Sequence, residues 1–196
     1  MGRRLVFLTV GPVDRLLMQK PEDAMETTQT EGLVFMTDLS GFSRLTRSMD
    51  LMDLAELLKD FAAITWKHIG VHGGTVIKYL GDSALGYFTA DRVDEGVQAL
   101  MDMKRDIETN LSVDGKQAKI RVGAHYGPFV LTDLEPIMQP DIFGETVNIA
   151  NMLGSGGQSS HRERMILTPE AFRKLSPAMR KAFHKFTEPV VYLAEL

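Results

Sequence analysis

The chain has 196 residues, of which 44% are apolar, and its net charge is −4 because 26 acidic residues outnumber 22 Lys and Arg. A chain of this length can build one well-packed domain. The acidic excess argues against nucleic acid or an anionic membrane surface as the main partner. The sequence contains no cysteine, which excludes disulfides, thiolate metal sites and cysteine nucleophiles.

The N-terminal segment, residues 1–30, is interpreted as an arm or linker that precedes a domain spanning 31–196. It holds one apolar stretch, LVFLTV, and then a polar run without periodicity. The apolar stretch is too short for a signal-peptide core or a membrane span. We therefore expect a cytoplasmic protein that does not bind a membrane.

The first predicted elements of the domain are a strand and a long helix. Residues 33–38 form a nearly continuous apolar run that ends in Asp38, which is typical of a strand buried on both faces. Mostly apolar residues then recur at steps of three and four along one face of a helix that ends at the HGG sequence: Leu51, Leu54, Leu58, Phe61, Thr65 and Ile69.

The stretch VIKYLGDSALGYF, residues 76–88, predicts a β-hairpin. Two β-prone runs flank the pair Gly81 and Asp82, a spacing that favours a two-residue turn of type II′. Because a hairpin tip faces solvent, we expect the Asp82 side chain to be exposed.

The remaining elements complete an α+β pattern. A second amphipathic helix covers 97–111, and in the strand 119–126 apolar residues alternate with Lys119, Arg121 and His125, so one face is expected in the core. A short helix (145–153), a flexible loop (155–164), a strand (165–168), a helix beginning at Pro169 and a terminal strand (189–196) follow. This order predicts a ferredoxin-like βαββαβ fold with a mixed, mainly antiparallel sheet and helices on one face.

Two aspartates are expected at the same edge of this sheet, since Asp38 leaves a strand and Asp82 lies at the tip of the neighbouring hairpin. Paired carboxylates suit Mg²⁺, which leaves its other positions to water and phosphate oxygens. The loop with Gly41 and Ser43 offers backbone N–H groups to a phosphate. Lys78 lies about 13 Å from Asp82 along one strand. It either serves the site of a second copy of the chain or is a solvated lysine on an edge strand.

Four stretches together resemble the catalytic domain of the class III nucleotidyl cyclases, the adenylate and guanylate cyclase family. They are FMTDLSGFSRLT, GGTVIKYLGDSALGYF, IRVGAHYGPFV and DIFGETVNIANML, and the resemblance covers residues 31–194. It implies conversion of a nucleoside triphosphate, with ATP as the expected substrate, to a 3′,5′-cyclic nucleotide and pyrophosphate. It also implies two Mg²⁺ or Mn²⁺ ions and a homodimer with composite active sites.

The resemblance also implies roles for single residues. Asp38 and Asp82, with the backbone carbonyl of Leu39, would bind the metals, and Lys78 and Asp141 would read an adenine base. The other matched positions are Asn148 for the ribose, the loop residues Gly41, Phe42 and Ser43 for the phosphates, and Lys185, preferred over His184, for the terminal phosphates.

One position departs from the family pattern. Four residues after Asn148 the family usually has an arginine that stabilises charge on the transferring phosphate, and this chain has Met152. Loss of such a group typically costs roughly 10²- to 10³-fold in rate. Arg162 and Arg164 are candidate substitutes by their proximity in sequence. Met152 is the reason to consider one alternative function, a degenerate cyclase that binds nucleotide without turnover. A second alternative, suggested by short bacterial members of the family, is a pyrimidine cyclase that makes cyclic UMP or cyclic CMP in bacterial antiviral signalling, against which Lys78 and Asp141 count.

Overall fold

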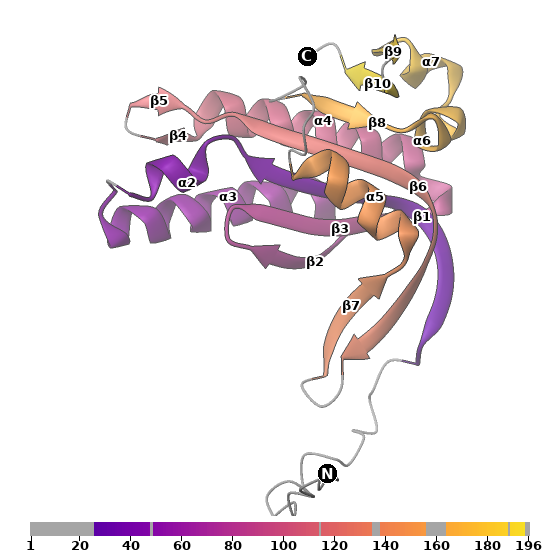
Figure 1. Cartoon of the computed structure of the whole chain (residues 1–196), viewed down its shortest axis with the longest axis horizontal. Helices are drawn as coiled ribbons and strands as arrows, with labels where there is room; N and C mark the ends of the chain where they lie inside the picture. Colours follow the sequence, from indigo (N-terminus) through magenta and orange to yellow (C-terminus); the bar gives the residue numbers. More distant parts are fainter. Residues whose placement is uncertain are drawn as a thin grey trace, which may run out of the picture.

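A computed structural model of the chain describes residues 26–47, 49–113, 115–134, 138–155, 164–187 and 189–194 (Figure 1). The strands are β1 (Thr28–Leu39), β2 (Thr75–Leu80), β3 (Ser83–Thr89), β4 (Ser112–Val113), β5 (Lys116–Gln117), β6 (Ile120–Leu134), β7 (Gln139–Phe143), β8 (Met165–Leu167), β9 (Phe183–Thr187) and β10 (Val190–Ala194). The helices are α2 (Phe42–Leu45), α3 (Leu51–Val71), α4 (Val93–Asn110), α5 (Glu145–Gly154), α6 (Pro169–Lys174) and α7 (Pro177–Arg180), with a 3₁₀ turn at Ala90–Arg92.

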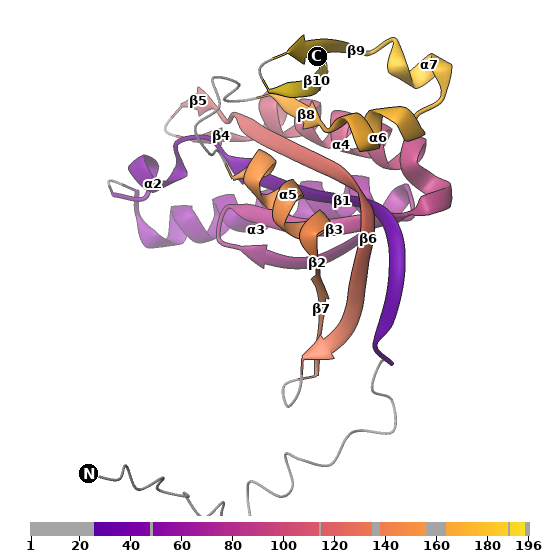
Figure 2. The ribbon, with the colours of Figure 1, turned by 45° about the vertical axis from the view of Figure 1, so that its right-hand side comes forward.

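The main sheet has eight strands in the order β2-β3-β1-β6-β8-β10-β9, and β7 pairs with β6 beside this path. All of its pairings are antiparallel except that between β6 and β8. Strand β6 continues past the body of the sheet and forms a curved arm with β7 and the beginning of β1 (Figures 1 and 2). The α+β fold with a mainly antiparallel sheet is confirmed.

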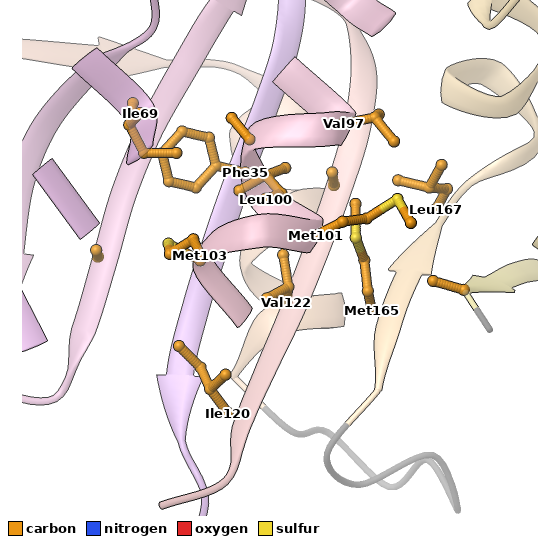
Figure 3. Close-up of a cluster of buried hydrophobic side chains, with 14 of the residues drawn as sticks. Phe35, Ile69, Val97, Leu100, Met101, Met103, Ile120, Val122, Met165 and Leu167 are labelled. Carbon is orange, nitrogen blue, oxygen red and sulfur yellow. The ribbon is translucent and has the colours of Figure 1, made fainter. Parts of the chain in front are cut away.

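The two faces of β1 are covered by different helices. Leu33 and Phe35 belong to the largest buried cluster, which includes residues of α3 and α4, whereas Val34 and Met36 pack in a second cluster with Ala150 of α5. Figure 3 shows the α4 residues Val97, Leu100, Met101 and Met103 beside side chains of the sheet in the first cluster. The expected helices on one face are thus α3 and α4, and α5 covers part of the other face.

The position of α5 corrects the prediction for strand β6. Arg121 and His125, expected on an open polar face, are only 6% and 8% exposed. The local alternation of the strand was recognised correctly, but both faces are covered because α5 lies against β1 and β6. The close approach requires glycine: a Cβ on Gly123 would lie 2.4 Å from the backbone nitrogen of Gly154.

The long helix and the first strand agree with the prediction except in some of their buried residues and boundaries. The long helix is confirmed, but its buried residues are Leu57, Phe61, Thr65 and Ile69, and Leu51 is 78% exposed. The first turns of α3 extend past the end of β3 in both ribbon views (Figures 1 and 2), which leaves them without a sheet to cover. Strand β1 begins at Thr28, so the last residues of the predicted arm belong to the sheet. Residues 1–25 of that arm and 156–163 of the predicted loop lie outside the described residues.

The hairpin is confirmed in register and in turn type. Leu80 pairs with Ser83, so Gly81 and Asp82 are the two turn residues. Gly81 has φ +62°, and Asp82 is not among the residues with positive φ, which is the pattern of a type II′ turn. None of the helices in the described ranges has the length and apolar character needed to cross a bilayer.

The contact between α5 and the sheet gives a test of this packing. A Cβ at Gly154 would lie 2.4 Å from the carbonyl oxygen of Met36, whereas a Cβ at Gly70 of α3 meets nothing within 4 Å. Overpacking typically costs about 1–3 kcal/mol, and replacing glycine by alanine inside an open helix stabilises by up to about 1 kcal/mol. We expect Gly154→Ala to lower the free energy of unfolding in urea and Gly70→Ala to leave it unchanged or raise it. Equal effects of the two variants would contradict the packing of α5.

Candidate functional site

The candidate site begins where β1 ends, at the pair Asp38 and Asp82. The backbone N–H of Leu39 donates to the carbonyl oxygen of Asp82 at 3.2 Å, which holds the tip of the hairpin against the end of β1. The hydroxyl of Ser83 donates to Oδ1 of Asp38 at 3.0 Å. The two aspartates therefore lie together at one edge of the sheet, as the sequence predicts.

Burial shifts the pKa values of both carboxyl groups upwards, and repulsion adds to the shift at Asp82. Burial is the main cause at Asp38, where the hydrogen bond from Ser83 and the charge of Arg121 act in the opposite direction on the pKa. At Asp82, burial and then the negative charge of Asp38 raise the pKa to about 6. Asp82 is half-buried, which corrects the expectation of an exposed tip, because the hairpin folds back on β1.

Arg121 is a site residue that sequence reasoning missed. It pairs with Asp38 across β1 and β6, so both side chains leave the sheet on the α5 face. Its side chain is 6% exposed, and Nε is buried with no hydrogen-bond partner among the described residues. A buried donor without a partner is rare in native proteins and often marks a site for an absent ligand or ion. The signal was the register between the two strands, which one sequence does not display.

Lys78 and Asp141 form a second cluster within the same chain. Lys78 Nζ lies 2.5 Å from Asp141 Oδ2, and the two side chains are 26% and 5% exposed. The backbone N–H of Ile142 donates to Asp141 Oδ1 at 2.8 Å. Both oxygens of this buried carboxylate therefore accept a hydrogen bond.

A β-bulge at Ile77 sets the direction of Lys78. Val76 pairs with Gly86 and Lys78 with Leu85, so two residues of β2 lie opposite one step of β3. Ile77 packs against the cluster that contains Leu85, and Lys78 is the cross-strand neighbour of Leu85, so both lie on the α5 face. The bulge turns the lysine toward β7.

Helix α5 carries two more of the predicted residues. Asn148 is exposed, and Met152, one turn further along, is 63% exposed. Helix α5 directly follows β7, so its N-terminal end lies next to the strand of Asp141. Arg162 lies outside the described residues, and Arg164 is exposed immediately before β8.

The predicted phosphate residues do not all gather at the site. Gly41 has φ +79° and precedes α2, where Phe42 packs against the core and Ser43 is exposed. Lys185 is exposed on β9, the edge strand at the opposite end of the sheet from β2. Within one chain the structure brings Lys185 to neither cluster.

The α+β sheet thus carries a carboxylate pair at the end of β1 and a separate lysine–aspartate pair on β2 and β7, the two groups that the resemblance to the nucleotidyl cyclases predicts. The family model of the adenylate and guanylate cyclase catalytic domain matches residues 24–190. The chain belongs to this family.

Relatives and solved structures agree with this assignment. The chain is 36% identical over 122 residues to an adenylate cyclase of Streptomyces coelicolor, covering 62% of this chain and 29% of the relative. It is 35% identical over 133 residues to an adenylate cyclase of Streptomyces griseus, covering 68% of this chain and 30% of the relative. The adenylyl cyclase CyaB from P. aeruginosa superposes with a TM-score of 0.73 at 20% identity, covering 88% of this chain and 97% of that one. The guanylate cyclase domain of RhGC from Catenaria anguillulae, in complex with GTP, superposes with a TM-score of 0.73 at 18% identity. The match covers 86% of this chain and 98% of that one. The chain thus spans about three tenths of the length of these two curated relatives.

The repulsion between Asp38 and Asp82 predicts a gain in stability when one charge is removed. The folded-state pKa of Asp82, about 6, lies above the ordinary value of 3.8, so this carboxyl group binds more protons in the folded than in the unfolded chain between about pH 4 and 6. The contribution of Asp82 to the free energy of unfolding must then fall as pH rises through this window. After discounting for solvent screening, the loss is on the order of 1 kcal/mol.

In a chelating buffer at pH 7 we therefore expect Asp82→Asn to unfold at a higher urea concentration than the wild type. We also expect a flatter pH dependence between pH 4 and 6. Asp60→Asn, at an exposed position on α3, is the matched control. If Asp82→Asn is no more stable than Asp60→Asn, the charge of Asp82 does not lower the free energy of unfolding.

Proposed function

We propose that the protein is a homodimeric nucleotidyl cyclase that converts ATP to 3′,5′-cyclic AMP and pyrophosphate. The observation that carries the proposal is the buried ion pair between Lys78 and Asp141, which lies in the same chain as the carboxylate pair but apart from it. The Lys78–Asp141 pair suits a base, and the carboxylate pair suits a metal–triphosphate. The family and the relatives named adenylate cyclase support the same reaction.

The ion pair fits adenine by its donors and acceptors. Lys78 donates to a ring nitrogen of the base, and Asp141 accepts from the exocyclic amine. Each oxygen of Asp141 already accepts one hydrogen bond, from Lys78 or from Ile142. A carboxylate oxygen has a second lone-pair site, so the amine can be accommodated without breaking the ion pair. A pyrimidine, with a smaller ring, would fill this position less well.

The reach of Lys78 supports a site shared between two subunits. The ammonium group of Lys78 is held by Asp141 of β7, whereas Asp82 lies in the turn that follows β2. Large apolar side chains are exposed nearby, with Leu80 52%, Phe143 43% and Met152 63% exposed. Such residues often mark a protein interface. In the proposed head-to-tail dimer, one subunit supplies Asp38 and Asp82 and the other supplies Lys78, Asp141 and Asn148.

The carboxylate pair fits divalent cations. Both groups are half-buried, and each is a hard oxygen ligand of the kind that Mg²⁺ and Mn²⁺ prefer. Burial and then the negative charge of Asp38 raise the pKa of Asp82. Asp38, Asp82 and the carbonyl of Leu39 would hold two ions, which neutralise the triphosphate and favour ionisation of the ribose 3′-hydroxyl.

The chain's own residues position the reaction. Asn148 orients the ribose so that its 3′-oxygen faces the α-phosphorus, and the backbone of Gly41, Phe42 and Ser43 contacts the phosphates. Arg121 offers its unpartnered Nε to the phosphates from beside Asp38. Lys185 contacts the terminal phosphates from the partner subunit, since it is far from Asp38 in its own chain. Catalysis then consists of positioning and charge stabilisation.

The exposed Met152 favours one second candidate, a domain that binds a metal–nucleotide complex without turnover. An arginine at this position would stabilise charge on the transferring phosphate, and methionine cannot. Substrate-dependent stabilisation without product would support this alternative.

The first test is to incubate the protein separately with ATP, GTP, CTP and UTP in Mg²⁺ and in Mn²⁺ and to identify products by mass spectrometry. We expect cyclic AMP from ATP and much less product from the other nucleotides, because the Lys78–Asp141 pair matches adenine. Asp38→Ala is the blank, and Asp60→Asn should keep full activity. A cyclic pyrimidine nucleotide as main product would overturn the assignment of ATP, and no product in either metal would support the binding alternative.

A second test addresses the composite site. Asp38→Ala and Asn148→Ala should each be inactive, because each removes one half of both sites. When the two variants are mixed and allowed to exchange subunits, half of the dimers are mixed, and each has one intact site. We therefore expect about one quarter of the wild-type rate. A mixture as inactive as its components would show that Asp38 and Asn148 act within one chain.

A further inference from the structure

We propose that Arg164 joins Arg121 in a two-arginine site that holds the leaving pyrophosphate and so compensates for the arginine that Met152 replaces. This inference rests on the proposed cyclase function. It assigns to Arg164 a contact with the β- and γ-phosphates, in the subunit that also supplies Asp38.

The register of β6 and β8 places Arg164 beside Arg121. The strands run parallel, with Val122 paired to Met165, and the N–H of Val122 donates to the carbonyl oxygen of Arg164 at 3.1 Å. Val122 and Met165 both enter the large core cluster, where Figure 3 shows them on adjacent strands. Arg164 lies one residue before β8, and the hydrogen bond from Val122 keeps its backbone beside β6, so alternation along the two chains places Arg121 and Arg164 on the face opposite Val122 and Met165. Arg121 and Arg164 are therefore neighbours on the α5 face.

The same face carries a row of polar residues across four strands. Ser83 on β3 pairs with Asp38 on β1, and Asp38 pairs with Arg121 on β6. Arg164 extends this row by one strand, about 10 Å from Asp38 at the usual strand spacing. The row thus runs from the proposed metal ligand to two guanidinium groups.

Neither guanidinium forms a close ion pair with a carboxylate of the described residues, although the charge of Asp38 attracts Arg121 across β1 and β6. No carboxylate among those residues lies within 4.0 Å of Arg121 or Arg164. The Nε of Arg121 is buried without a partner there, in a side chain that is 94% buried by its 6% exposure. A buried donor and an adjacent exposed cation fit an anion that bridges them.

The chemistry of the step explains why this site can substitute for a group on the α-phosphate. The ribose 3′-oxygen forms a bond to the α-phosphorus, and its proton leaves to solvent. The bond from the α-phosphorus to the bridging oxygen breaks, and that oxygen departs with the electron pair on pyrophosphate. Negative charge therefore builds on the leaving group, and guanidinium groups bind phosphate oxygens with charge-assisted hydrogen bonds. Stabilising the leaving group lowers the same barrier that the missing arginine would lower.

The experiment measures kcat, KM and the inhibition constant of pyrophosphate in Arg164→Ala, Arg164→Lys and the control Arg105→Ala. Arg105 is an exposed cation on α4, on the other face of the sheet. We expect Arg164→Ala to lower kcat roughly tenfold to a hundredfold and to weaken pyrophosphate inhibition by a similar factor. Arg164→Lys should recover part of both losses, and Arg105→Ala should change neither.

A cycle with Met152→Arg tests compensation directly. If Arg164 replaces the missing arginine, Met152→Arg raises kcat and the cost of Arg164→Ala shrinks to about threefold or less in its presence. If Arg164→Ala lowers kcat as much in the Met152→Arg background as in the wild type, Arg164 does not compensate for the missing arginine. If Arg164→Ala has the same kcat, KM and pyrophosphate inhibition constant as Arg105→Ala, the proposed two-arginine site is wrong.

Binding of Mn²⁺–pyrophosphate, measured by calorimetry, separates this inference from the proposed function. If the wild type makes no cyclic product but Arg164→Ala weakens pyrophosphate binding and Arg105→Ala does not, the cyclase assignment fails and the anion site stands. If the wild type is an active cyclase and Arg164→Ala binds pyrophosphate as the wild type does, the cyclase stands and the site fails.

Discussion

The register of β1 between β3 and β6 is the constraint on which the site depends. It brings Ser83, Asp38 and Arg121 into one row. A slip by one residue would exchange the two faces of β1. Phe35 would then leave the core and Asp38 would enter it. Because Leu33 and Phe35 are fully buried against one helix layer and Val34 against the other, core packing opposes the slip. The hydrophobic core therefore fixes the position of the catalytic candidates.

The two clusters of the site differ in how their charges are balanced. Asp141 is buried and is balanced by Lys78 and by the N–H of Ile142. Asp38 and Asp82 are half-buried and repel each other, and the hydrogen bond from Ser83 and the charge of Arg121 only partly offset this at Asp38. In the proposed function the first cluster is preorganised for a neutral base. The second, with its excess negative charge, would need cations before it could accept a triphosphate.

Local sequence patterns predicted those parts of the molecule that local physics determines. The Gly-Asp turn between β-prone runs gave the hairpin and its turn type, and the periodicity of Val97, Leu100 and Met103 gave the second helix. The resemblance to a family placed Lys78 and Asp141 in one cluster, where the structure has them. The burial of Arg121 could not be predicted, because the alternation of one strand does not show that α5, from a later part of the chain, packs on the same face of β6.

Two further features depend on pairings that one sequence does not display. The bulge at Ile77 aims Lys78 at β7, and no glycine or proline marks it in the sequence. The parallel register of β6 and β8 sets Arg164 next to Arg121, whereas proximity in sequence left Arg162 and Arg164 equivalent. In both cases the side-chain direction follows from strand pairing.

In the proposed dimer, Met152 changes which subunit supplies the groups that stabilise charge on the phosphates. An arginine at that position would act from α5, in the subunit that binds the base. With methionine there, the proposed guanidinium groups beside the phosphates come from β6 and from the residue before β8, in the subunit that binds the metals, and Lys185 is the cation that the other subunit supplies. One subunit then selects the nucleotide and the other carries most of the charge stabilisation. Small changes in how the two subunits are oriented would consequently alter turnover more than base selection, because turnover alone requires both halves to be aligned.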